Sequence, residues 1–116
     1  MSSETKENKR LFQAIAEFQQ KFYPNWLTEE KPRTLFSTAL AGEVGEVCGV
    51  VTHLDGGGTN NKKYTERKLL SECCDSYIQL ALLVMKSGFT YADFEKELWH
   101  ILKEELPQRL AEKRGK

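Results

Sequence analysis

The chain of 116 residues is poor in cysteine and has no excess of either charge. Its three cysteines are odd in number and two are adjacent, which fits neither a disulfide framework nor the ligand spacing of a zinc site. The 17 basic residues balance 17 acidic ones, so the composition gives no sign of a binding surface for nucleic acid. We expect reduced thiols, and a small anionic ligand remains compatible with zero net charge because it needs only a local cluster.

Long apolar runs are missing as well. No uninterrupted run reaches the ~18 residues that a membrane span needs, and the polar first ten residues lack the hydrophobic segment of a signal peptide. The glycines at 56–58 are not followed by the Gly-Lys-Ser/Thr of a phosphate-binding P-loop. We therefore expect a cytoplasmic protein that does not enter a membrane.

No segment shows the period-2 alternation of a β-strand, and apolar residues recur at helical spacing instead. We predict an all-α fold of one domain, residues 1–116, built as a four-helix bundle. The expected helices cover residues 5–23, 32–54, 65–87 and 90–105. Residues 55–61 read as a loop and 112–116 as a frayed, solvated tail. So short a chain buries only roughly two-thirds of its unfolded surface, so we also expect a homodimer or homotetramer.

Local signals support these helix ends. Pro24 stops the first helix, and Thr65 is a suitable N-cap for the third. Gly88 ends the third helix, because glycine readily adopts the left-handed conformation of a C-cap. The segment Thr90-Tyr-Ala-Asp93 resembles a capping box with aspartate in place of glutamate.

Two acidic pairs are the most informative feature of the chain. Glu43 and Glu46 on the second predicted helix, and Glu72 and Asp75 on the third, each have i,i+3 spacing and share one helix face. Both pairs interrupt apolar stretches, and two like charges ~4 Å apart cost about 4 kcal/mol at an effective dielectric constant of ~20. A divalent cation offsets this repulsion, and oxygen ligands select Mg²⁺ or Mn²⁺ over zinc. The pattern predicts metal-assisted chemistry on a phosphate.

Two structural alternatives stand beside this interpretation. Arg67 or Lys68 is spaced to pair with Glu72, which would make the acids part of an ion network. Three glycines lie within the second predicted helix, at a cost of ~1 kcal/mol each relative to alanine. They permit either close approach of another helix or space for a metal and its ligand; they are Gly42, Gly45 and Gly49.

Glu-x-x-Glu followed by Glu-x-x-Asp after a short spacer is the signature of the all-α nucleoside triphosphate pyrophosphohydrolases, and the chain resembles their MazG-like branch. The resemblance runs from about Leu11 to Leu106. It is strongest from Lys31 to Val47, where a Pro-Arg-Thr-Leu entry leads to Glu-Val-Gly-Glu. It implies Mg²⁺-dependent hydrolysis of a (deoxy)nucleoside triphosphate to the monophosphate and pyrophosphate, a housecleaning activity on nucleotide pools.

The resemblance also implies residue roles. Glu43, Glu46, Glu72 and Asp75 match the metal ligands of the family, with Mn²⁺ as a possible substitute ion. A carboxylate must accept the proton of the attacking water, and we expect Glu46 to do so.

Further candidates would contact the substrate. For the phosphates we name five basic residues: Lys96 and Lys103, which occupy the basic slots of the last helix in related sequences, and Lys62, Lys63 and Arg67 beside the glycine loop. For the base, His53 falls where many relatives have a stacking tryptophan, and Trp26 is a substitute. His100 departs from the asparagine of the family.

Two rival functions remain open on the sequence. One is a pyrophosphohydrolase with another substrate, such as dUTP or phosphoribosyl-ATP, because base recognition depends on residues that deviate here. The other is a non-catalytic helical module that binds a partner protein. An acidic quartet that faces inward is unfavourable for such a module, so we favour the enzyme.

Overall fold

A computed structural model describes residues 3–30, 33–56 and 64–115, and within these ranges the chain is helical, without strands. The predicted all-α class is therefore confirmed for the described part. The elements are α1 (Ser3–Phe22), α2 (Thr34–Gly56), α3 (Glu66–Lys86), α4 (Tyr91–His100), a π-helical turn η1 (Ile101–Glu105) and α5 (Leu106–Arg114). Pro32, the proline of the Pro-Arg-Thr-Leu entry to the second predicted helix, and most of the predicted loop 55–61 lie outside the described residues.

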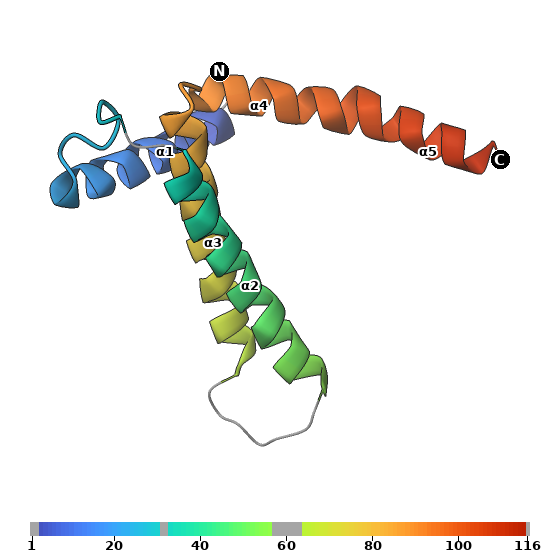
Figure 1. Cartoon of the computed structure of the whole chain (residues 1–116). Helices are drawn as coiled ribbons and strands as arrows, with labels where there is room; N and C mark the ends of the chain where they lie inside the picture. Colours follow the sequence, from blue (N-terminus) through green and yellow to red (C-terminus); the bar gives the residue numbers. More distant parts are fainter. Residues whose placement is uncertain (1–2, 31–32, 57–63, 116) are drawn as a thin grey trace.

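Helices α2 and α3 form an antiparallel hairpin, in which each is the other's main packing partner (Figure 1). Val50 of α2 and Ala81 and Leu82 of α3 are buried. The start of α3 is fixed as predicted, because the Thr65 side chain accepts a hydrogen bond from the backbone N–H of Lys68 at 3.1 Å. This hairpin is the scaffold that holds Glu43 and Glu46 of α2 opposite Glu72 of α3.

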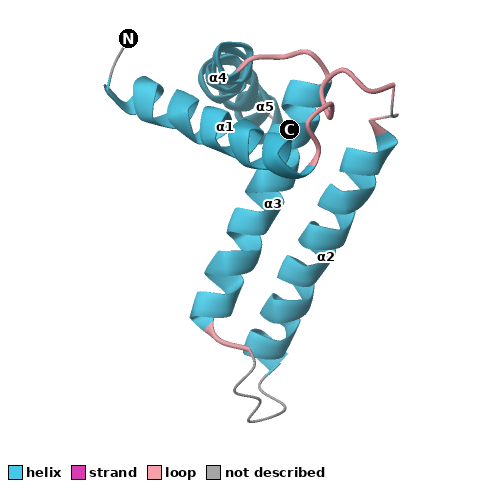
Figure 2. Ribbon diagram, turned by 90° about the vertical axis from the view of Figure 1, so that its left-hand side faces the viewer, coloured by secondary structure: helices cyan, strands magenta, loops and turns pink. Residues whose placement is uncertain are grey.

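Helix α1 crosses the hairpin near the start of α4 (Figure 2). Its buried anchor is Phe12, whose ring packs edge-on against Tyr77 of α3 and Tyr91 of α4 at centroid distances of 6.2 and 5.1 Å. The predicted capping box that opens α4 is confirmed, because Thr90 and Asp93 exchange side-chain and backbone hydrogen bonds.

The segment between α1 and α2 is held to the end of α3 by one lysine. The Lys86 ammonium donates hydrogen bonds to the backbone carbonyls of Trp26, at 2.6 Å, and Glu29, at 2.7 Å. Both partners lie about 60 positions earlier in the chain, so this contact fixes the segment in space. Trp26 is only 3% exposed, and its ring centroid lies 6.0 Å from that of Phe36.

The end of the chain differs from the sequence expectation. The helix that begins at Tyr91 continues past Glu105 through η1 into α5 and reaches Arg114, so most of the predicted frayed tail is helical. Proline has no N–H to donate to the carbonyl four residues earlier, which favours a break. Here Pro107 sits in the first turn of α5, and the wider π turn before it keeps the helix continuous, with the N–H of Leu106 bonded to the carbonyl of Ile101.

The single chain is open rather than compact. Its radius of gyration is 17.7 Å, whereas a compact chain of this length has about 13 Å. Helices α4 and α5 extend away from the hairpin as one long arm (Figure 1). Several apolar positions at helical spacing stay exposed in the single chain, among them Leu11, Phe18, Phe22, Leu70, Leu98, Leu102, Leu106 and Leu110. A closed bundle would therefore need helices from outside this chain.

Helix α2 is long and apolar enough, by length and composition alone, to cross a membrane. The expectation of no membrane span came from the lack of an uninterrupted apolar run. Valine, leucine, alanine and phenylalanine raise the mean hydropathy of α2, although Glu43 and Glu46 lie near its middle. A core helix of a soluble protein passes the same test, so this is weak evidence, and the absence of a membrane contact stays a prediction.

Candidate metal centre

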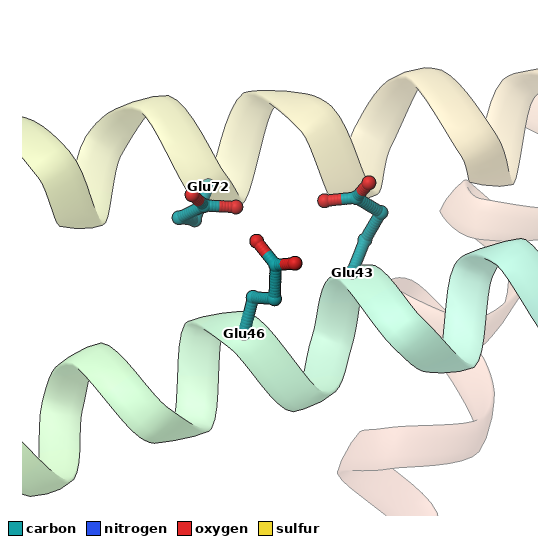
Figure 3. A group of neighbouring side chains, drawn as sticks. All are labelled: Glu43, Glu46 and Glu72. Carbon is teal, nitrogen blue, oxygen red and sulfur yellow. The ribbon is translucent and has the colours of Figure 1, made fainter.

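Three of the four predicted carboxylates meet between α2 and α3. Oxygen atoms of Glu43, Glu46 and Glu72 lie within 4.8 Å of one another. Figure 3 shows Glu43 and Glu46 projecting from successive turns of α2 toward α3, and Glu72 projecting from α3 between the two helices. The i,i+3 spacing puts the first two on one face, and the antiparallel hairpin supplies the third.

Glu72 is the buried member of this group. Its residue is 3% exposed, and its Oε1 accepts a hydrogen bond from the Lys68 ammonium at 2.7 Å. The other oxygen, Oε2, is buried and has no hydrogen-bond partner among the described residues. Buried carboxylate oxygens are normally paired, so this oxygen is one for which a cation is a suitable partner.

The three carboxyl groups influence each other's protonation. A hydrogen bond with Glu72, followed by the negative charges of Glu72 and Glu43, raises the pKa of Glu46. That hydrogen bond exists only while Glu46 carries a proton; when both carboxylates are ionised, Glu72 Oε2 has no hydrogen-bond donor among the described residues. The Lys68 hydrogen bond is the main cause that lowers the pKa of Glu72, and the pKa of Lys68 is raised chiefly by the same contact. The cluster therefore favours the ionised form of Glu72 and makes Glu46 hold its proton to a higher pH than an isolated carboxyl group would.

Asp75, the fourth predicted ligand, is not brought into this group. It is exposed on α3, one turn after Glu72, and its oxygens do not belong to the group of carboxylate oxygens that lie within 4.8 Å of one another. Its charge does act on Lys68, since it contributes to the raised pKa of that ammonium. Asp75 therefore lies outside the cluster, one turn beyond Glu72 on α3, and its role as a metal ligand stays a prediction.

A cavity of about 380 Å³ opens beside the carboxylates, toward the hairpin end. It is lined by Glu46, Gly49, Val50, His53, Tyr64, Lys68 and Glu72. The ring of the predicted base contact His53 is stacked on Tyr64, with centroids 3.9 Å apart and planes 15° from parallel. One face of this imidazole is thus already covered, and the pair forms an aromatic wall of the cavity.

The glycines of α2 do not mark a close contact with another helix of this chain. A Cβ atom added at Gly42, Gly45 or Gly49 would meet no atom of the described residues within 4 Å. Close helix approach within the chain, the structural alternative for these residues, is therefore not what the structure has. Gly49 lines the acidic cavity, which agrees with the other interpretation, space beside the carboxylates.

A second cavity of about 270 Å³ lies near the other end of the hairpin and contains the second predicted base contact, Trp26. Its walls combine aromatic and aliphatic groups with the side chains of two glutamines; the lining residues are Gln19, Tyr23, Trp26, Glu29, Leu35, Phe36, Ala39, Gln79 and Leu82. The buried indole N–H of Trp26 has no acceptor among the described residues. Ala39 is one helical turn, about 6 Å along the axis, from Glu43.

The predicted phosphate contacts that the structure describes are not gathered at the carboxylates. Lys96 lines a cavity at the junction of α3 and α4, and the Lys103 ammonium lies 4.8 Å from the ring centroid of Trp99. Both are on the arm that leaves the hairpin (Figure 1). Arg67 borders a neighbouring cavity on α3. Lys62 and Lys63 lie outside the described residues.

Two residues at this centre were not named as site residues from the sequence. Lys68 appeared only as an alternative partner of Glu72, although its i,i+4 spacing was a signal of direct contact. Tyr64 gave no signal, because its contact with His53 depends on how the hairpin closes. Both line the cavity that Glu46 and Glu72 share.

Comparison of the chain with protein-family models, with curated proteins and with solved structures finds no match. The resemblance to the pyrophosphohydrolases therefore rests on the acidic pairs and the segment before them.

Proposed function

We propose that this protein is a Mg²⁺-dependent pyrophosphohydrolase that cleaves a (deoxy)nucleoside triphosphate into the monophosphate and pyrophosphate. The observation that carries the proposal is the buried, unpartnered oxygen of Glu72, which shares its surroundings with Glu43 and Glu46. Three carboxylates face one ammonium, so the ionised cluster has an excess of two negative charges, which a divalent cation would balance.

The donor set fits magnesium. All three groups are carboxylates, the oxygen ligands that Mg²⁺ and Mn²⁺ prefer. Ligand oxygens around Mg²⁺ lie at most about 4.2 Å apart, twice the Mg–O distance of ~2.1 Å. The carboxylate oxygens of Glu43, Glu46 and Glu72 lie within 4.8 Å of one another, and Glu43 and Glu46 are not buried. Small rotations of these two side chains would bring the oxygens to the spacing that Mg²⁺ needs. Glu43, Glu46 and Glu72 would hold the ion, with Asp75 as the fourth ligand that the family pattern implies.

When bound, the ion would offset charge on the phosphate oxygens and lower the pKa of a water ligand. The proton of the attacking water must go to a base of the protein. We assign this role to Glu46, whose carboxylate belongs to the cluster and lines the cavity beside it. Lys68 lies in the same cavity and would add a positive charge beside the phosphates.

The Trp26 cavity is the better place for the base. It offers an indole and a phenyl ring, a buried N–H donor and two glutamine side chains, which together provide stacking and edge hydrogen bonds. The face that Tyr64 occupies on His53 is no longer open to a base. We therefore propose that the triphosphate lies at the carboxylates and the base points toward Trp26.

Assembly with further copies of this chain is part of the proposal. The open shape of the single chain and its exposed apolar positions on α1 and along α4 and α5 support a homodimer or homotetramer. Lys96 and Lys103 do not approach the carboxylate cluster of their own chain. In an assembly they could lie beside the carboxylate cluster of a second copy.

Thermal unfolding with and without metal tests the proposal. At 100 times its dissociation constant, a ligand that binds only the folded state adds about 2.7 kcal/mol, which raises the melting temperature of a chain this size by roughly 10 °C. We expect Mg²⁺ or Mn²⁺ to produce such a rise in the wild type and not in Glu72→Gln. Pyrophosphate release from dNTPs, NTPs, dUTP and phosphoribosyl-ATP then identifies the substrate.

Glu72→Gln also distinguishes a metal-binding enzyme from a protein in which the carboxylates form a structural ion network. Its amide removes one of three neighbouring negative charges, and the half-exposed Lys68 can turn to solvent, so the variant should fold without metal. Unfolding of the metal-free variant would show that the carboxylates serve stability instead. No metal-dependent rise in the wild type would favour the helical interaction module.

A further inference from the structure

Lys68 forms an ion pair with a carboxylate of the candidate metal centre, a contact that metal binding by the carboxylates does not require. Its ammonium lies 2.7 Å from the buried Glu72 Oε1, while about half of its side chain is exposed. The negative charges of Glu46 and Asp75 act on it as well. One lysine therefore already provides part of the positive charge that the carboxylates attract.

The Lys68 side chain borders two cavities, so its ammonium can occupy a second position away from Glu72. It lines the acidic cavity together with Glu46, and it lines the neighbouring cavity of about 580 Å³ that Arg67 borders. A lysine is a point charge on a flexible stem, so its ammonium can leave Glu72 without moving α3. Glu72 cannot follow it, because its side chain is buried between the helices.

We infer that Lys68 is an internal counter-cation of this centre, which a divalent ion displaces from Glu72, and that the displaced ammonium then binds a phosphate oxygen of the substrate. The inference rests on the proposed function. Lys68 and the ion compete for the same buried carboxylate, so Lys68 weakens metal binding and stabilises the protein without metal. After displacement, the ammonium remains beside the phosphates at the mouth of the cavity.

Competition predicts opposite effects for two substitutions of the same residue. Lys68→Gln removes the competing charge, so Mn²⁺ should bind about three- to tenfold more tightly than to the wild type. Lys68→Arg replaces the ammonium by a group that can hold a carboxylate with two hydrogen bonds, so Mn²⁺ should bind about threefold more weakly. A purely structural role does not predict a gain of affinity in either variant.

The assay is titration with Mn²⁺ in the absence of nucleotide, with free ion followed by electron paramagnetic resonance. Arg67→Gln is the matched control, because it removes the same charge from the adjacent, exposed position of α3. It should change the affinity less than twofold. Equal changes in Lys68→Gln and Arg67→Gln, or no gain in Lys68→Gln, would overturn the inference, as would an Arg variant that binds Mn²⁺ as well as the wild type does.

A second measurement tests the phosphate contact. With Mn²⁺ saturating, inorganic tripolyphosphate should bind Lys68→Gln about tenfold more weakly than wild type, and equal binding would remove this part of the inference. Failure of the proposed function has a different signature. If the wild type and all variants bind no Mn²⁺, the metal centre itself is refuted, whereas loss of the competition alone leaves the centre in place.

Discussion

The contact between Lys86 and the segment before α2 allows a quantitative test of the fold around Trp26. In Lys86→Met the stem of the side chain is kept and the ammonium is lost, together with hydrogen bonds of 2.6 and 2.7 Å to the carbonyls of Trp26 and Glu29. Hydrogen bonds to a charged group contribute about 1.5–3 kcal/mol each. The Glu29 carbonyl can regain water, since this contact is exposed, so we expect a net loss of about 2 kcal/mol.

Such a loss lowers the melting temperature by roughly 8 °C in a chain of this size. It should also expose the indole of Trp26, because the ammonium is the direct tie between residues 26–29 and α3. Urea unfolding followed by tryptophan fluorescence measures the first effect, and acrylamide quenching measures the second. Both are best done with Trp99→Phe in the background, because Trp99 is 51% exposed and would mask the signal of Trp26.

The control is Lys9→Met, which removes an exposed ammonium from the middle of α1. It should change the stability by no more than ~0.5 kcal/mol. If Lys86→Met is as stable as this control and quenching of Trp26 is unchanged, the ammonium does not hold the segment, and the Trp26 cavity loses its support.

Three further predictions follow from particular contacts. The backbone N–H of Thr90, and then its side chain, lower the pKa of Asp93, so the stability that Asp93 adds is present above its unfolded pKa of 3.8 and is lost as the pH falls through the lower folded value. The difference in unfolding free energy between wild type and Asp93→Asn should therefore be constant near neutral pH and shrink below about pH 4; a constant difference down to pH 2 would contradict it. Gly45→Ala should stabilise the protein by about 1 kcal/mol in urea unfolding, because the added Cβ meets no atom within 4 Å, and a loss would reveal a close neighbour from a second chain. Light scattering should give a mass above 13.3 kDa, and a monomer would refute assembly through the exposed apolar positions.

Much of the local structure could be predicted from short-range signals. Thr65, Gly88 and the Thr90–Asp93 box each act within one turn of the chain, so the ends of α3 and the start of α4 follow from the residues themselves. Pro107 shows the limit of such signals. Proline usually interrupts a helix, yet a single wide turn absorbs it here, and the outcome depends on the geometry of the preceding residues.

The sequence by itself determined that Glu43 and Glu46 share a face, because helical spacing is a property of the chain. Only the tertiary structure decided that Glu72 joins them while Asp75 stays exposed, because the way α2 packs along α3 determines which of these two carboxylates lies opposite Glu43 and Glu46. It also decided that His53 stacks on Tyr64, and that Lys96 and Lys103 lie on a distant arm. These contacts depend on how helices cross, and the spacing of residues within one helix carries no information on that.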